Sequence, residues 1–278
     1  MKKLFCGIGI GILIILIIFY APKKSTNISV QEIVNHQQKT FINNLSSTVM
    51  VNGASGVVIY KTDTEMYVLT ARHVLFKTDI VFVKDPKDTK DYTFIVDLIH
   101  NGKKEKLFYK KIIVPNEENH IKFYYRSQQG YEIDTIDIQG FPVYLNKERD
   151  LAVLKVNFIN EDIQPVIGGN EPTYNNKLYK IACPMEMSPV ATDGILGGFT
   201  EYGDETKGIF TGGTIFGNSG GGIFNSKHEC VGVVMAVYKK GEIISHLGIF
   251  TLITKKELDN IIQEAIMNIG TLDMKEVP

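Results

Sequence analysis

The sequence predicts an all-β body that is closed by one C-terminal α-helix and preceded by a membrane-spanning helix. Three observations carry this prediction. Short runs rich in β-branched and aromatic residues follow one another along most of the chain, each bounded by Gly, Pro, Asn or Asp. An amphipathic pattern of helical period occurs clearly only near the C-terminus, and an uncharged apolar run stands at the N-terminus.

The composition is that of an ordinary globular protein. The chain has 278 residues, 30 basic and 31 acidic side chains, and a formal net charge of −1. Phosphate recognition normally shows as an excess or clustering of Lys and Arg, and here only short lysine pairs occur. We therefore expect no nucleic-acid partner. The length allows two folding units with a sizeable core.

The N-terminal segment predicts a membrane anchor. Leu4–Ala21 carries no charge and has lysine pairs on both flanks. A spanning helix needs about 20 apolar residues, with a range of about 17 to 25. Because Phe19 and Tyr20 stand where a cleavage site needs small residues, we favour an uncleaved single-pass anchor over a protein secreted after signal cleavage. The flanking lysines favour, weakly, a body on the extracytoplasmic side.

These features divide the chain into five expected segments. They are a membrane anchor or signal at 1–24, a polar tether with room for a short helix at 25–45, a first strand-rich unit at 46–160, a second one with the terminal helix at 161–270, and a tail at 271–278.

Two series of strands are expected in the body, and no internal repeat relates them. The first series is Ser47–Val51, Gly56–Tyr60, Met66–Thr70, Ile80–Val83, Tyr92–Leu98, Leu107–Val114, Ile121–Tyr125 and Leu151–Val156. The second series is Lys177–Cys183, Gly194–Phe199, Gly208–Thr211, Gly221–Asn225, Cys230–Val237 and Leu247–Ile253. Such spacing with turn residues between the runs is typical of sandwiches and barrels.

The terminal helix has its own start and stop signals. Thr254 and Glu257 form a capping box. Gly270 is expected to end the helix. The residues expected on its apolar face are Leu258, Ile261, Ile262, Ala265, Ile266 and Ile269.

The glycine-rich turn Gly217–Gly221 contains the candidate nucleophile, Ser219. Acyl transfer needs a hydroxyl or thiol on a tight turn, with main-chain N–H groups beside it to stabilise an oxyanion. The flanking glycines let the main chain fold closely, so that the amides of Gly217 and Ser219 can meet one carbonyl oxygen. Taken alone, most such turns are plain hairpin turns.

Serine also needs a base to take its proton and a carboxylate to orient that base. His73 follows the strand-like stretch that ends at Arg72, and Asp150 opens the stretch Asp150–Val156. A single His in such a place is usually a surface side chain, and a single Asp before a strand is usually a turn residue. The interpretation depends on the three motifs together.

Together these stretches resemble the trypsin-like serine proteases of the chymotrypsin fold, and most closely the HtrA-type branch. The resemblance covers most of the chain from Ser47 to the terminal helix. The segments that carry it are Ala54–Ile59, Tyr67–Leu75, Asp150–Val156, Ile181–Pro184, Thr192–Leu196, Gly217–Gly221, Val231–Val237 and Gly248–Thr251.

The resemblance implies two six-stranded antiparallel β-barrels of chymotrypsin type. It implies that Ser219 attacks the scissile carbonyl and that His73 acts as base and then as acid. Asp150 would fix the His73 tautomer, and the amides of Gly217 and Ser219 would hold the oxyanion. The motif order, His73 then Asp150 then Ser219, is the order of this family. An α/β-hydrolase of small esters would show the reverse arrangement, with Ser first and His last.

The resemblance also implies a substrate pocket without charge. Gly213 and Thr214 would lie at its base, with Val237 and Gly248 on its walls. Burying a cation there without a carboxylate is costly, so we expect cleavage after small or medium aliphatic residues rather than after Lys or Arg. Val234 stands where glutamate-specific relatives have a His, so cleavage after acidic residues is not expected. His246 lies nearby and is interpreted as an ordinary loop residue. No cofactor and no metal are expected.

The chain departs from the family in several places. The segment between His73 and Asp150 is long and Lys-rich, and we interpret its excess as one or two added hairpins. Met235 stands where a hydroxyl usually supports the triad carboxylate. No PDZ domain is expected after the protease part.

The leading hypothesis is a membrane-tethered serine endopeptidase acting on protein or peptide substrates. The alternative is a catalytically idle protease homologue that serves as a membrane-associated binding or adaptor module. HtrA-type enzymes commonly form trimers. No residue of this sequence indicates such an assembly, so the sequence leaves the monomer and the homo-oligomer as alternatives.

The three cysteines, Cys6, Cys183 and Cys230, show none of the close pairs that zinc sites need. We expect Cys183 and Cys230 to be small buried side chains on strands. A disulfide between these two stays open if the body is exported.

Overall fold

A computed structural model of the chain describes residues 30–100, 103–240, 242–268 and 272. The predicted anchor at 1–24, Cys6 and nearly all of the predicted tail lie outside these residues. Among the described helices, none combines the length and the apolar character that crossing a membrane would require. The chain divides after His36, and both barrels described below belong to the second unit, Gln37–Pro278.

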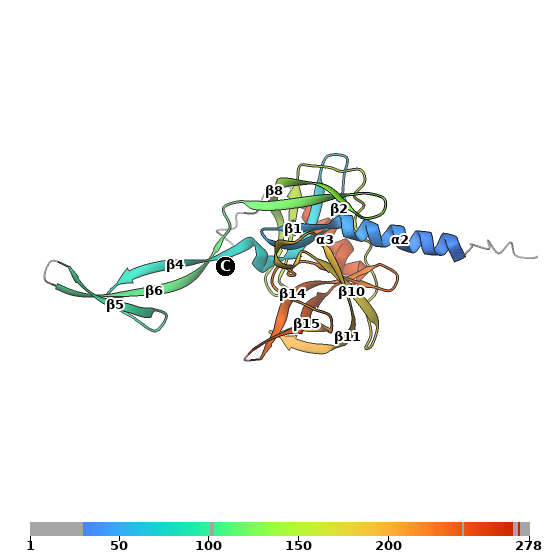
Figure 1. Cartoon of the computed structure of the whole chain (residues 1–278). Helices are drawn as coiled ribbons and strands as arrows, with labels where there is room; N and C mark the ends of the chain where they lie inside the picture. Colours follow the sequence, from blue (N-terminus) through green and yellow to red (C-terminus); the bar gives the residue numbers. More distant parts are fainter. Residues whose placement is uncertain (1–29, 101–102, 241, 269–271, 273–278) are drawn as a thin grey trace, which may run out of the picture. The chain divides into compact units, whose positions relative to one another are not determined.

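The first barrel is closed by six antiparallel strands in the order β1-β2-β3-β9-β8-β7 (Figure 1). Its strands are β1 (Thr48–Val51), β2 (Ala54–Lys61), β3 (Met66–Ala71), β7 (Asn119–Arg126), β8 (Glu132–Asn146) and β9 (Leu151–Val156). The alternation of apolar residues sends one face of each strand inward, where Val68, Ile121, Phe123 and Leu154 are fully buried.

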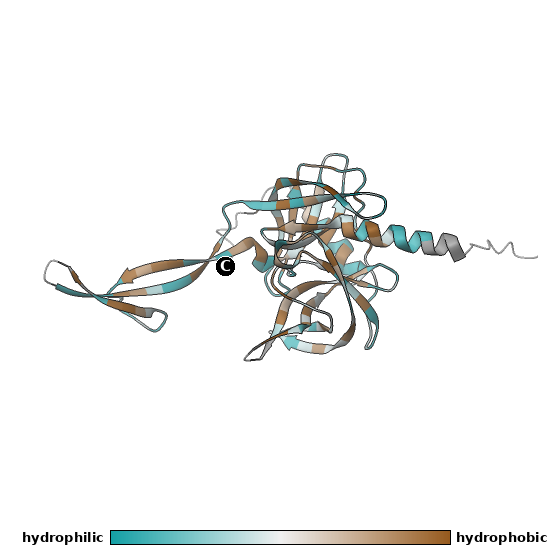
Figure 2. Cartoon of the chain, viewed as in Figure 1, coloured by the Kyte–Doolittle hydropathy of each residue, from teal (hydrophilic) through white to brown (hydrophobic). Residues whose placement is uncertain are grey.

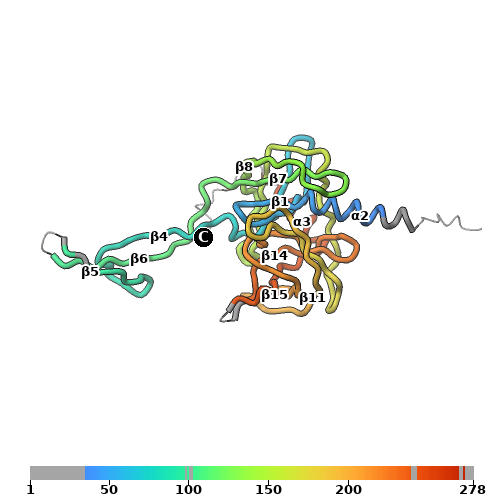
Figure 3. The backbone as a smooth tube through the Cα atoms, in the orientation of Figure 1, coloured from blue at the N-terminus to red at the C-terminus, as the bar shows by residue number. Residues whose placement is uncertain are grey.

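The second barrel repeats this architecture with the order β10-β11-β12-β15-β14-β13. Figure 3 labels β11, β14 and β15 of this barrel. Its strands are β10 (Lys177–Ala182), β11 (Val190–Tyr202), β12 (Glu205–Phe210), β13 (Gly222–Asn225), β14 (Cys230–Lys240) and β15 (Glu242–Leu252). Leu196, Phe210 and Phe250 fill its interior. The prediction of two six-stranded antiparallel barrels is confirmed.

A third cluster of buried side chains joins the two barrels and the terminal helix α3 (Lys255–Met267). Leu69 of the first barrel, Ile181 and Phe224 of the second, and Leu258 and Ile261 of α3 belong to this one cluster. The barrels are therefore packed on each other through an apolar interface, which sets the position of any residue that lies between them.

The capping box of α3 is present, with Thr254 and Glu257 each bonded to the other's main-chain N–H. Ile269 and Gly270 lie outside the described residues. The other helix, α2 (Val30–Ser47), has 18 residues. It replaces much of the expected tether and is longer than the short helix foreseen there. Tertiary contacts support its last turn, where the buried Asn44 donates to the Tyr179 hydroxyl (3.0 Å) and to the His228 carbonyl (2.9 Å).

Strand β8 was not predicted, because its sequence contains Gly140 and Pro142, which usually interrupt strands. The register with β9 shifts between Pro142 and Tyr144, and this irregularity accommodates the missing N–H of the proline. Gly140 lies against β7, where an added Cβ would come within 2.6 Å of Ile121. The glycine therefore serves close strand packing rather than a turn.

The long segment between His73 and Asp150 adds a separate three-stranded sheet in the order β4-β6-β5. Its strands are β4 (Phe76–Lys84), β5 (Thr93–His100) and β6 (Lys103–Pro115). The β5–β6 pair is a hairpin, as expected, and β4 extends it to three strands. Apolar and polar residues are mixed along all three strands (Figure 2).

Candidate active site

His73 and Asp150 meet at the end of the β3–β9 ladder. The ladder pairs Ala71 with Leu151, so the residues that follow β3 lie beside the residue that precedes β9. Arg72 N–H donates to the Asp150 carbonyl oxygen at 3.0 Å, which continues the ladder by one step. His73 then enters the short 3-10 helix η1 (Arg72–Leu75). Asp150 takes a left-handed conformation with φ of 55°, which turns the chain into β9.

Both carboxylate oxygens of Asp150 are directed at His73. The Asp150 Oδ1 atom accepts from the His73 main-chain N–H at 2.9 Å, and Oδ2 lies 2.7 Å from Nδ1 of the ring. The carboxylate thus holds both the backbone and the ring of one histidine, which leaves Nε2 as the ring nitrogen that can exchange protons with a substrate or nucleophile. The histidine side chain is 50% exposed and the aspartate side chain 20%.

The second barrel presents Ser219 on the turn between β12 and β13. Gly217 and Gly220 have φ of 88° and 86°, a region that favours glycine. The carbonyl oxygen of Ser219 accepts from Ser55 N–H of the first barrel at 2.8 Å. The Ser219 hydroxyl donates to the Met235 carbonyl oxygen at 3.2 Å rather than to His73.

The main chain beside Ser219 can receive an oxyanion. The Phe216 carbonyl oxygen accepts from Met185 N–H at 2.9 Å. In a trans peptide the N–H points opposite to the carbonyl, so this bond directs the Gly217 N–H away from Met185. Within the described residues, the amides of Gly217 and Ser219 donate to no internal acceptor. Both therefore keep a free donor at the place where the sequence predicts an oxyanion hole.

Three of the four predicted pocket residues are in direct contact or are register partners. Val237 pairs with Gly248 in the β14–β15 ladder. A Cβ on Gly248 would lie 2.5 Å from Thr214 Oγ1, so glycine is needed for this close approach. Gly213 precedes Thr214 in the chain. His246, expected in a loop, is exposed on β15 instead.

Sequence analysis missed Lys180, a buried cation behind the pocket residues. Its ammonium group donates to the Gly213 carbonyl oxygen and lies 3.4 Å from Thr214 Oγ1. Burial lowers the pKa of Lys180 from 10.5 to about 8. The one signal in the sequence is that Lys180 alternates with Leu178 and Ala182, and Leu178 lies on the face of β10 that points into the second barrel.

Met235 is buried and is the extra residue of an irregularity in the β14–β15 ladder. Its side chain brings no hydroxyl, but the turn that carries Asp150 has other support from the second barrel. The Arg149 carbonyl oxygen accepts from the Thr251 hydroxyl at 2.9 Å and from Lys207 at 3.4 Å. These bonds hold the residue adjacent to Asp150.

Cys183 and Cys230 are both buried free cysteines, so they form no disulfide with each other. Burial raises the pKa of the Cys183 thiol to about 12 and that of Cys230 to about 11. Neither thiol is a nucleophile near neutral pH. In the described part of the chain, no group of three or more His, Cys, Asp or Glu side chains is placed to hold a metal ion.

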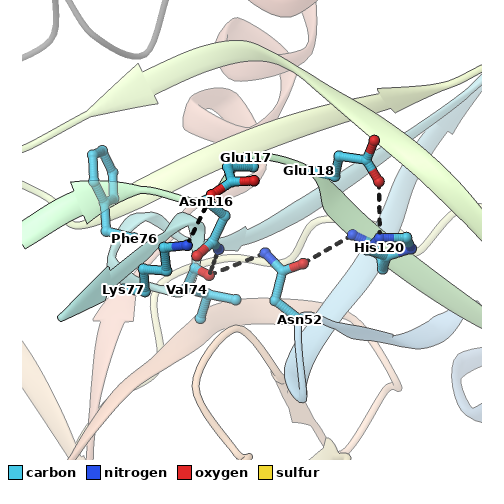
Figure 4. A pocket seen from close by; sticks show the side chains of 8 residues that line it. All are labelled: Asn52, Val74, Phe76, Lys77, Asn116, Glu117, Glu118 and His120. Atoms are coloured by element: carbon cyan, nitrogen blue, oxygen red, sulfur yellow. Dashed lines mark hydrogen bonds and ion pairs between the residues drawn. The ribbon is translucent and has the colours of Figure 1, made fainter. Parts of the chain in front are cut away.

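A polar cavity of about 620 Å³ begins at the residue after His73 (Figure 4). Asn52 and Asn116 both donate to the Val74 carbonyl oxygen at 3.1 Å, which ties three segments together at this wall. An ion pair joins Lys77 to Glu117 (3.3 Å), and His120 Nε2 lies 3.4 Å from Glu118 Oε2. No motif in the sequence indicated this cavity.

Comparison with known families places the chain. The family model described as the trypsin-like peptidase domain matches residues 54–233. The chain belongs to the trypsin-like peptidase family. Comparison with curated proteins found no match.

Solved HtrA-type structures share its fold. The protease AlgW with a decapeptide has a TM-score of 0.51 and 17% identity, over 77% of this chain and 51% of that one. An alanine variant of AlgW with a tripeptide has a TM-score of 0.56 and 14% identity, over 84% and 64%. The chain thus spans about half of the AlgW chain in the decapeptide structure.

A further structure is the inactive form of a serine-to-alanine mutant of Rv3671c from M. tuberculosis H37Rv. It has a TM-score of 0.50 and 14% identity, over 84% of this chain and 94% of that one. At these identities the similarity establishes the fold and leaves activity to be argued from the site.

Proposed function

We propose that this protein is a membrane-tethered serine endopeptidase in which His73, Asp150 and Ser219 hydrolyse peptide bonds by way of an acyl-enzyme. The proposal rests above all on the Asp150 carboxylate, both of whose oxygens are engaged with His73. A surface ion pair would be satisfied by one such contact. Two contacts fix the ring in the orientation that a general base needs.

The chemistry follows from the positions of these groups. Ser219 Oγ attacks the scissile carbonyl carbon while His73 Nε2 takes the hydroxyl proton. Asp150 accepts a hydrogen bond from Nδ1–H of the imidazolium that forms and stays ionised, while the amides of Gly217 and Ser219 hold the oxyanion. The C–N bond breaks as His73 returns the proton to the leaving amine. Water then repeats the sequence on the acyl-enzyme and releases the acid.

One movement must precede attack. The Ser219 hydroxyl donates to Met235 O in the free protein, so it has to turn from this acceptor toward His73. Rotation about a single side-chain bond changes the acceptor, and a catalytic hydrogen bond often tightens only when substrate is bound.

We further propose that the enzyme cleaves after small or medium aliphatic residues. None of the predicted pocket residues Gly213, Thr214, Val237 and Gly248 is charged, and the β-branched side chain of Val237 would narrow the pocket. The Lys180 ammonium group behind Gly213 is an added reason to disfavour Lys or Arg, because a second cation would be brought near a buried one. A peptide-library profile dominated by cleavage after Lys or Arg would contradict this specificity.

The tether and location are proposed from the sequence. Leu4–Ala21 would anchor the chain, with the body on the extracytoplasmic side. Fractionation and protease protection of intact cells test this: the body should sediment with membranes and be cleaved from outside. A soluble body released without Leu4–Ala21 would support signal cleavage instead.

Fluorophosphonate labelling of the full-length protein, mapped by mass spectrometry, tests the catalytic proposal, because the probe reacts only with an activated hydroxyl. Labelling is expected at Ser219 and should vanish in Ser219→Ala. If the folded protein is not labelled at Ser219, the idle homologue acting as a binding module becomes the better description.

A further inference from the structure

We propose that Ser55, a residue of the first barrel, is a positioning residue that holds the oxyanion-binding turn of the second barrel. The inference rests on the proposed peptidase function. Ser55 lies in β2 and is fully buried. It does not reach a substrate, and its effect would come through the main chain of Gly217 and Ser219.

The Ser55 hydroxyl makes two hydrogen bonds that both end on the second barrel. It accepts from Cys183 N–H at 2.7 Å and donates to the Gly217 carbonyl oxygen at 2.6 Å. One hydroxyl thus joins the end of β10 to the glycine turn. Alanine at this position would leave a buried donor on Cys183 and a partly buried acceptor on Gly217 without their partner.

The main chain of Ser55 makes two more contacts at the same place. Its N–H donates to the Ser219 carbonyl oxygen at 2.8 Å, and its own carbonyl accepts from the Thr70 hydroxyl at 2.6 Å. A Cβ on Gly220 would lie 1.9 Å from this carbonyl. Ser55 is therefore in contact with the turn on both sides of the nucleophile.

These bonds orient the two donors that would stabilise the oxyanion. The peptide before Gly217 is held by Met185 N–H, and the peptide after it is held by the Ser55 hydroxyl. The Gly217 N–H belongs to the peptide plane held by Met185, and the Ser55 bond to the next plane restrains rotation about the Gly217 Cα, so the two bonds together hold this N–H in its orientation. Since β2 belongs to the other barrel, the packing of the barrels on each other determines whether the oxyanion site is formed.

Ser55→Ala tests the inference, with Ser47→Ala as the matched control. Ser47 is also fully buried, and its hydroxyl lies within hydrogen-bond reach of two main-chain oxygens, those of Asn43 and Gln164. It lies at the end of α2, so the same atoms are removed away from the glycine turn. Both variants are made in the full-length protein and checked for folding by thermal unfolding.

The measurements separate positioning from general destabilisation. Hydrolysis of an N-acylated alanine p-nitrophenyl ester gives kcat and KM, and inhibition by an N-acylated aminoboronic acid reports affinity for a tetrahedral adduct. Ser55→Ala is expected to lower kcat about 10- to 100-fold. This is a smaller loss than the roughly 10²- to 10³-fold decrease that follows removal of an oxyanion donor itself. Boronate affinity should fall in proportion, while KM changes less than about twofold. Ser47→Ala should alter neither kcat nor boronate affinity.

Wild-type kcat and boronate affinity in folded Ser55→Ala would overturn the inference while leaving the proposed function intact. Absence of both hydrolysis and Ser219 labelling in the wild-type protein would contradict the proposed function, and the Ser55 role with it. If Ser55→Ala does not fold, Ser55→Cys under reducing conditions takes its place, because the thiol keeps the volume but is a weak donor. A drop in kcat at constant KM in that variant supports positioning, and wild-type kcat contradicts it.

Discussion

Two regions of the molecule have similar strand-forming sequence but different surroundings. One is the junction where the two barrels pack on each other, and the other is the three-stranded β4–β6–β5 sheet. At the junction, each barrel holds a turn of the other that carries a candidate catalytic residue: Ser55 bonds to Gly217, and Thr251 bonds to Arg149 beside Asp150. In the three-stranded sheet, apolar side chains such as Ile99 and Ile113 are 83% and 78% exposed. Similar strand propensity therefore leads to different environments, depending on whether a second element packs against the strands.

The largest expected effect is on the junction's chemistry. Asp150→Asn should lower kcat about 10⁴-fold. The Asp150 carboxylate now accepts from the main-chain N–H and from Nδ1 of His73, and an asparagine amide would present its own N–H to one of these two groups. His73 would then adopt the wrong tautomer. Peptide or ester hydrolysis measures the loss.

Asp137→Asn is its control, since Asp137 also lies beside a histidine, with its Oδ1 atom 3.3 Å from His120 Nδ1. That pair is exposed, it belongs to the paired strands β7 and β8, and among the described contacts neither residue bonds to His73, Asp150 or Ser219, so activity should be unchanged. Equal losses in the two variants would refute a special role for Asp150.

Close packing at the junction predicts the next effect. Gly220→Ala should destabilise the protein by about 4 kcal/mol or more, because φ is 86° and the Cβ would come within 1.9 Å of Ser55 O. Gly203→Ala should cost only about 1 kcal/mol, since Gly203 also has positive φ but its Cβ would meet nothing within 4 Å. Urea unfolding measures the free energy of unfolding of both variants. Similar unfolding midpoints would show that the junction accommodates the added methyl group.

The two kinds of strand can be compared with one substitution type. Ile121→Ala in β7 should lower the free energy of unfolding by about 3 kcal/mol, because the side chain is fully buried in the first barrel. Ile113→Ala in β6 should change it by less than about 0.5 kcal/mol, because Ile113 is 78% exposed. A large cost at Ile113 would mean that another surface covers the sheet.

Lys180 predicts a smaller, pH-dependent effect. Folding lowers the lysine pKa from 10.5 to about 8, so between these values the unfolded chain binds more protons than the folded protein. The free energy of unfolding contributed by this group therefore rises from pH 8 to pH 10.5, by about 3 kcal/mol at most.

Lys180→Met isolates this contribution from other groups. The stability of the wild type relative to Lys180→Met should increase as pH is raised from 7 to 10, measured by urea unfolding at each pH. A difference that stays constant over this range would show that Lys180 keeps its ordinary pKa.

Local pattern was enough to predict much of the molecule. Turn residues and β-branched runs located most strands, and the Thr254–Glu257 capping box located the start of α3, because these signals act within a few residues. The motifs around His73, Asp150 and Ser219, taken in order, pointed to the trypsin-like family. The geometry at His73 and Asp150 agrees with the expected pairing, whereas their catalytic roles stay a proposal.

Other features depended on partners distant in sequence, and only the tertiary structure decided them. Strand β8 tolerates Pro142 because a register shift against β9 absorbs it, and the end of α2 is held by Tyr179. Local sequence did not indicate what Lys180 and Ser55 bond to, since their partners, Gly213 and Gly217, lie far along the chain. A sequence specifies its own turns and periodicity. Which distant main-chain atoms a buried side chain must satisfy is determined only when the two barrels close and pack together.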